Sequence, residues 1–143
     1  MRMVLLIAVL LFAGIMLIVP IETSAQGTDP RGGHMHEQMK KLHTMMPMFS
    51  IASAELESAL EKGDAAAAIT LANKILAAVP DLKKSKPHKN IKNQKKFVEL
   101  ATELEKSVNS TVYFIKGDNF SGAKTAFKKV EETCAVCHAK FRD

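Results

Sequence analysis

The stretch LEKGD at residues 60–64 decides how this chain folds, because it returns in nearly the same form as IKGD at residues 115–118. Gly63 and Gly117 can each take the left-handed backbone conformation that ends a helix. The aspartate after each glycine can cap the first turn of the next helix through a side-chain oxygen. Turns this short make the flanking helices antiparallel, so the sequence predicts two helical hairpins.

Apolar side chains recur every three or four residues along four segments, which span residues 35–60, 65–79, 97–115 and 120–141. This spacing places them on one face of a helix, and no stretch alternates as a strand does. A lone helical hairpin would leave one apolar face of each helix in water. We therefore expect an all-α protein, an antiparallel four-helix bundle formed by the two hairpins.

Two prolines bear on the lengths of these helices. The segment from Pro80 to Lys96 holds seven lysines and no acid after Asp81, and we expect it to form the crossover between the hairpins. Pro47 lies inside the first apolar segment and cannot donate a backbone hydrogen bond. Either the first helix kinks there or it starts there. We favour the kink, because the apolar spacing continues without a phase break.

Residues 1–25 resemble a secretory signal peptide rather than part of the fold. Arg2 precedes an apolar run from Met3 to Val19, and Thr23-Ser-Ala25 offers small residues for cleavage. The alternative is an uncleaved membrane anchor, because such a run is at the short end of the ~17–25 residues that span a bilayer. Residues 26–143 then form one domain, which is periplasmic and free of the membrane once the signal peptide is cleaved.

The composition argues against nucleic acid as a partner. The chain has a net charge of +5, but it contains no tryptophan and a single tyrosine. Stacking aromatic side chains usually accompany a basic surface that binds nucleic acid. The positive charge is better suited to solubility or to an acidic protein partner.

The chain's two cysteines lie in the motif Cys134-Ala-Val-Cys137-His138. C-x-x-C-H is the attachment signature of c-type haem. Two thiols one helical turn apart can add to the two vinyl groups of a porphyrin, and the histidine that follows can then bind the iron. We therefore predict one covalently attached haem c near the C-terminus, with His138 as the proximal ligand.

Three other interpretations compete with haem attachment. A C-x-x-C redox pair usually opens a helix after a strand, and no strand is expected here. A structural zinc site needs four ligands, and the motif supplies three. The cysteines could also be plain core residues, because both fall on the apolar stripe of the fourth helix. That position would place the haem between helices.

Two residues after the motif are further candidates for the site. Phe141 lies three residues after His138 and would pack beside the haem ring. Arg142 lies one turn after His138 and could pair with a haem propionate. Arg142 could equally be a solvated side chain near the chain end.

A four-helix bundle whose last helix ends in C-x-x-C-H-x-x-Phe-Arg resembles the class II c-type cytochromes, which comprise cytochrome c′ and its low-spin relatives. Lys86-Pro87, at the predicted opening of the third helical region, and Gly117-Asp118 lie at similar spacing. The resemblance covers most of residues 35–143. It implies a periplasmic haem protein, often a homodimer, and Cys134, Cys137 and His138 match the family's thioether and proximal positions.

The first helix departs from the family, because it lacks the arginine of the Arg-Gln-x-x-Met or Leu pattern that places the distal residue. In an antiparallel bundle, the level of His138 on the first helix is found by counting back from Gly63 by the length that separates Asp118 from His138. This count reaches His43. Met46 is the leading distal candidate, His43 is the alternative and Met39 is third. A methionine on this stripe can equally belong to the core, and His43 can equally lie on the surface.

We expect an electron-transfer protein whose iron binds His138 and a methionine or histidine, with no enzymatic activity. The alternative is a five-coordinate haem that binds nitric oxide or carbon monoxide, with Leu42 guarding the open side. A third interpretation is a haem subunit of a larger redox complex. The lysines from Lys83 to Lys96 would form a docking face for an acidic redox partner or simply a solvated loop, and His88 among them is expected to lie in solvent.

Overall fold

The computed structural model describes the backbone of residues 30–142 and the side chains of residues 37 and 39–142. Its helices are α1 (Pro30–Lys62), α2 (Ala65–Lys84), the 3-10 helix η1 (Ile91–Asn93), α3 (Gln94–Lys116) and α4 (Phe120–Phe141). Within these bounds there is no strand, so the predicted all-α class is confirmed. The predicted signal peptide, residues 1–25, lies outside the described residues.

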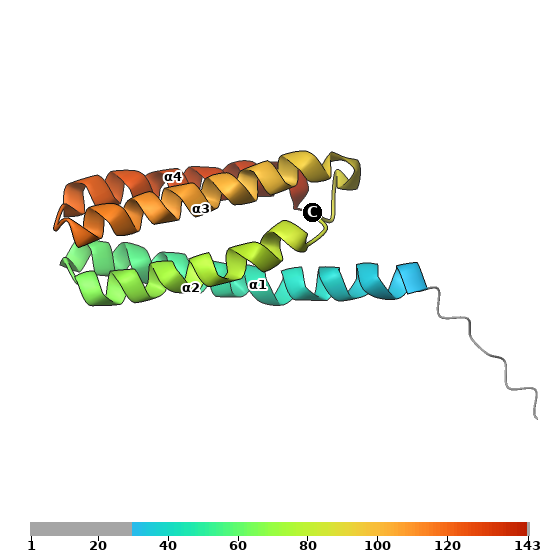
Figure 1. The fold of residues 1–143 in the computed structure, drawn as a ribbon, viewed down its shortest axis with the longest axis horizontal. Coiled ribbons are helices and arrows are strands. Elements are labelled where there is room, and N and C mark those ends of the chain that lie inside the picture. The colour runs from blue at the N-terminus through green and yellow to red at the C-terminus, as the bar shows by residue number, and fades with distance from the viewer. Residues whose placement is uncertain (1–29, 143) are drawn as a thin grey trace, which may run out of the picture.

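The four α-helices form an antiparallel bundle in which each helix packs against its neighbours in the chain (Figure 1). The ring closes between α1 and α4, and this is the least closely packed of the four helix pairs. The first turns of α1 extend past the end of the other helices (Figure 1). The seam between α1 and α4 is therefore the place where the bundle has room for something other than protein.

The turn between α1 and α2 forms as its sequence predicts. Gly63 has a φ of +70°, and the Asp64 N–H donates to the carbonyl of Ala59 at 2.9 Å. This pattern is a Schellman motif, which satisfies the last carbonyls of a helix. The Asp64 carboxylate accepts from the Ala67 N–H at 3.0 Å and caps α2.

The turn between α3 and α4 is shifted by one residue, so the prediction for Gly117 and Asp118 is wrong. Gly117 has a φ of −89°, and Asp118 takes the left-handed conformation with a φ of +54°. The side chain of Asn119 caps α4 instead, accepting from the Gly122 N–H at 2.8 Å. Both Asp118 and Asn119 are good helix caps, so the sequence allowed either register.

The crossover between the hairpins is shorter than predicted. Pro80 lies inside α2, which continues to Lys84 because Val79 and Leu82 extend its buried stripe. Residues 85–93 make the connection, and the third helix begins at Gln94, well after Lys86-Pro87. The exposed ring of Pro80 faces away from the core, where the loss of one backbone hydrogen bond is tolerated.

Helix α1 runs through Pro47 without ending, so the alternative that the first helix starts at this proline is wrong; the kink stays a prediction. Pro47 itself is exposed. The bundle core consists of inward-facing residues from all four helices, and its deepest members are Ala52, Leu56, Leu60, Ala68, Ala72, Ile75, Val79, Val108, Ala123 and Val130. Each larger aliphatic side chain buried in this way contributes about 1.5–3 kcal/mol.

By length and composition, α2 is the one helix in the described part of the chain that is apolar enough to cross a bilayer. The core helix of a bundle meets the same criterion. Ala68, Ala72, Ile75, Val79 and Leu82 of α2 are buried, and α2 packs against both α1 and α3. These contacts account for its apolar composition.

The two Lys-Gly-Asp turns should respond oppositely to one substitution. We expect Gly63→Ala to destabilise the protein by roughly 1–2 kcal/mol, because in the left-handed conformation the alanine Cβ comes too close to the following carbonyl oxygen. Gly117→Ala should be neutral or stabilising by up to about 1 kcal/mol, because the added Cβ meets only ordinary contacts at 3.7 Å. Urea unfolding followed by circular dichroism measures both changes. Equal losses at the two positions would contradict the difference in backbone conformation.

Candidate functional site

The last two turns of α4 carry the Cys-x-x-Cys-His motif into the bundle. Cys134, Cys137 and His138 are all half-buried, whereas the two residues between the cysteines are exposed. Cys134 and Cys137 are both free and pack against the hydrophobic core. The motif therefore presents two thiols and an imidazole from one side of a helix toward the interior.

These three side chains line a cavity of about 360 Å³ between the helices. That volume lies within the roughly 300–1,000 Å³ of typical cofactor and ligand sites. Opposite the motif on α4, the cavity has mainly apolar walls from α1, α2 and α3: Met46, Phe49, Ile75, Leu82, Phe97, Leu100, Ala101 and Leu104. Two carboxylates, Glu57 and Glu131, also line it.

A second cavity, of about 410 Å³, adjoins the first toward the C-terminal end of α4. Its lining includes Leu42 and His43 of α1, Pro87 and His88 of the crossover, and Arg142. The residues common to both cavities are Met46, Ser50, Phe97, Cys137 and His138. The two cavities therefore meet around His138 on α4 and Met46 on α1.

The protonation states of the motif suit haem attachment. Burial, and then the charge of Cys134, raise the pKa of Cys137 to about 11. Burial and the Glu131 carboxylate raise the pKa of Cys134. Burial and the Arg142 guanidinium lower the pKa of His138. At neutral pH the site thus offers two S–H groups and an imidazole with a free lone pair, the form that binds metal.

This donor set fits haem c. Two protonated thiols one turn apart, a neutral imidazole beside them and an apolar cavity in front of them are what thioether attachment and axial ligation need. The zinc interpretation is weaker, since no group of three or more His, Cys, Asp or Glu side chains gathers to hold an ion within the part of the chain that the structure describes.

Phe141 and Arg142 close the C-terminal end of the site. The buried Phe141 ring packs edge-on against Phe97, with the ring centroids 5.3 Å apart. Arg142 is exposed and lines the second cavity, and its backbone N–H donates to the His138 carbonyl at 3.0 Å. A propionate partner and a solvated arginine both remain compatible with this position.

The three distal candidates lie in different surroundings. Met46 is half-buried and lines both cavities together with His138. His43 is exposed and lines the second cavity alone, with its Nε2 atom 3.1 Å from Nε2 of His88. Met39, half-buried, lies nearly two turns before Met46, outside the lining of either cavity. Of these three candidates, Met46 is therefore the one that shares both cavity linings with His138.

The expectation that His88 lies in solvent is wrong, because the residue is half-buried and its ring contacts His43 edge-on. The sequence analysis also missed Ser50 and Glu57, which line the first cavity from α1. These residues are polar, so a search for apolar periodicity had no signal to detect them.

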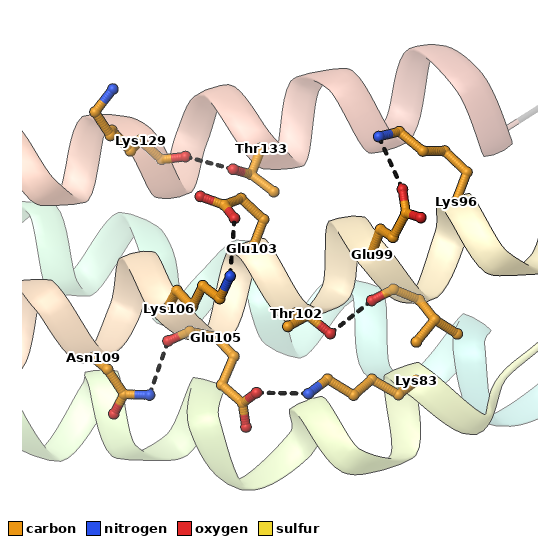
Figure 2. A network of polar contacts seen from close by, with 11 residues as sticks. Lys83, Lys96, Glu99, Thr102, Glu103, Glu105, Lys106, Asn109, Lys129 and Thr133 are labelled. Atoms are coloured by element: carbon orange, nitrogen blue, oxygen red, sulfur yellow. Dashed lines mark hydrogen bonds and ion pairs between the residues drawn. The ribbon is translucent and has the colours of Figure 1, made fainter.

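Part of the lysine-rich segment is already paired. Lys83 of α2 donates to Glu105 of α3 at 2.6 Å, and Lys96 forms an ion pair with Glu99 at 3.2 Å. Figure 2 shows both pairs beside the contacts along α3 and α4. Lys83 thus ties the two hairpins together, and a docking face for an acidic partner would consist of exposed lysines such as Lys84, Lys92 and Lys95.

The family model described as Cytochrome C′ matches residues 33–142. Comparisons with curated proteins and with solved structures give no match. The matched range includes all four α-helices except the first turn of α1, and it includes every residue that lines the two cavities.

The position of Arg142 predicts a change in the titration of His138. In protein prepared without haem, His138 should titrate below the ordinary histidine pKa of about 6.5, and Arg142→Ala should raise its pKa toward that value. Burial is the larger cause, so the pKa should remain lowered in the variant. Histidine NMR resonances followed against pH measure the shift.

Lys140→Ala is the matched control, because it removes an exposed cation from the same turn. It should leave the pKa of His138 as in the unmodified chain. An unchanged or lower pKa in Arg142→Ala would contradict the electrostatic contact between Arg142 and His138.

Proposed function

The chain belongs to the cytochrome c′ family, and on this premise we propose that it is a periplasmic c-type cytochrome that transfers electrons. Members of the family bind haem c and are mainly electron carriers or gas-binding proteins rather than enzymes. The periplasmic location follows from the predicted signal peptide and from the usual location of the family.

Cys134 and Cys137 attach one haem in this proposal. The two thiols would hold the haem through thioether bonds, each formed by adding S–H across one vinyl double bond, with sulfur on one carbon and hydrogen on the other. The raised pKa values of both thiols keep these hydrogens in place at neutral pH. Covalent attachment then holds the cofactor where the seam between α1 and α4 is least closely packed.

His138 and Met46 would hold the haem iron in this proposal. The observation that supports this assignment is that His138 of α4 and Met46 of the neighbouring helix α1 each line both cavities. His43 is the weaker candidate because its Nε2 atom already contacts His88. When bound, the haem supplies a one-electron iron couple, and a thioether ligand raises its potential relative to histidine.

A filled coordination sphere suits electron transfer because it leaves no open position for a substrate. The acidic partner remains a proposal. Exposed lysines around the crossover, including Lys84, Lys92 and Lys95, would steer an acidic protein toward the end of the bundle that holds the second cavity. The homodimer that the family resemblance implies is likewise a proposal.

Gas binding is the second candidate function, and one observation favours it. Leu42 is buried and lines the second cavity with His138, the position that an apolar guard of an open iron would occupy. In that case Met46 would be a wall residue, and nitric oxide or carbon monoxide would bind on the side of α1.

The optical spectrum of the ferrous protein separates these functions. We expect sharp low-spin bands that carbon monoxide leaves unchanged. Met46→Ala should convert them to a broad high-spin spectrum that responds to carbon monoxide, because the sixth ligand is lost. His43→Ala should have no such effect.

Met48→Ala is the matched control, since Met48 is a half-buried methionine of the same helix that packs on the core outside both cavity linings. It should keep the low-spin spectrum. A high-spin, carbon monoxide-sensitive spectrum in the unmodified protein would overturn electron transfer with Met46 as ligand and support gas binding.

A further inference from the structure

His43 and His88 form a pair of imidazoles that the haem site does not use. His43 comes from α1 and His88 from the crossover, 45 residues later in the chain. Their Nε2 atoms share a hydrogen bond of 3.1 Å, in which one neutral ring donates and the other accepts, and their ring centroids are 4.9 Å apart with an angle of 66° between the planes. Both residues line the second cavity, so the two nitrogens meet at its edge.

This spacing matches two imidazoles that share a metal ion. Zinc–nitrogen bonds are about 2.0–2.1 Å long, so two Nε2 ligands at an angle near 100° lie about 3.1 Å apart. With both lone pairs directed at the ion, the same arrangement puts the ring centroids about 4.9 Å apart. The nitrogen separation and the centroid separation therefore fit one ion position at one angle.

The backbone around His88 is fixed by contacts with the end of α4. Pro87, beside it, is buried. The Lys89 N–H donates to the Phe141 carbonyl at 3.2 Å, and the Asn90 side-chain amide donates to the Lys140 carbonyl at 2.6 Å. With His43 on a helix and His88 on an anchored connection, the pair is preorganised, which lowers the entropic cost of binding an ion.

We propose that His43 and His88 bind one divalent first-row transition ion, zinc(II) or copper(II), which are the ions that imidazole pairs favour. Water or a small anion would complete the coordination, because the described residues that line the cavity beside the pair include no carboxylate. Arg142 lines the same cavity and repels a cation, so the affinity will be well below that of a four-ligand zinc site.

A bound ion would connect α1 directly to the crossover. It would lie at the edge of the second cavity, away from Cys134, which lines only the first cavity. The assignment also gives His43 a role that excludes iron ligation. It does not depend on the haem function proposed above, because the two imidazoles and their anchors belong to the protein alone.

Calorimetric titration of the haem-loaded protein with zinc chloride tests the proposal. We expect one zinc ion per chain, with affinity reduced about tenfold or more in both His43→Gln and His88→Gln, because each variant loses the chelate. The double variant should be little weaker than either single one. Zinc should also raise the midpoint of thermal unfolding of the unmodified protein but not of the variants.

The matched control is the double variant His34→Gln/His36→Gln, which removes two other histidines of the chain and should keep the affinity of the unmodified protein. Loss of binding in that control, or affinities within about threefold of the unmodified protein in both single variants, would overturn the site. An altered haem spectrum of His43→Gln without added zinc would overturn it too, by assigning His43 to the iron. Unchanged zinc binding in Met46→Ala separates this site from the proposed function.

Discussion

The two thiols and the imidazole of one Cys-x-x-Cys-His motif on α4 constrain the rest of this molecule. Cys134, Cys137 and His138 lie within little more than one turn of α4, so a group attached to both thiols must lie against that face. The opposite wall has to leave space, and the structure provides it where α1 and α4 pack least closely. The other three helix contacts and the Lys83–Glu105 ion pair hold the bundle together around this looser seam.

The same constraint explains the chemistry of the site. Burial that raises the pKa of the thiols and lowers that of His138 keeps all three groups neutral. Neutral groups tolerate an apolar cavity that would penalise charge. The walls that make the pocket suitable for a porphyrin thus also favour the neutral forms of the two thiols and of His138.

Local signals predicted most of the fold, and the resemblance inferred from the motif is confirmed by the family match. The Gly63 turn forms as predicted because its glycine and cap allow one register, whereas Asn119 offered a second register after Gly117. Pro80 was taken for a helix end, but the core contacts of its neighbours outweigh one lost hydrogen bond. His88 was misplaced because its partner His43 is distant in sequence, and no local pattern reports such a contact.

The central claim is that Met46 faces His138 across the seam and completes the iron coordination. X-ray absorption at the iron edge of the purified protein tests it most directly, because it counts the atoms bound to iron without any substitution. The account predicts one sulfur scatterer in the first shell together with nitrogen ligands, since the thioether sulfurs of Cys134 and Cys137 lie outside that shell. A first shell of nitrogen alone would contradict it.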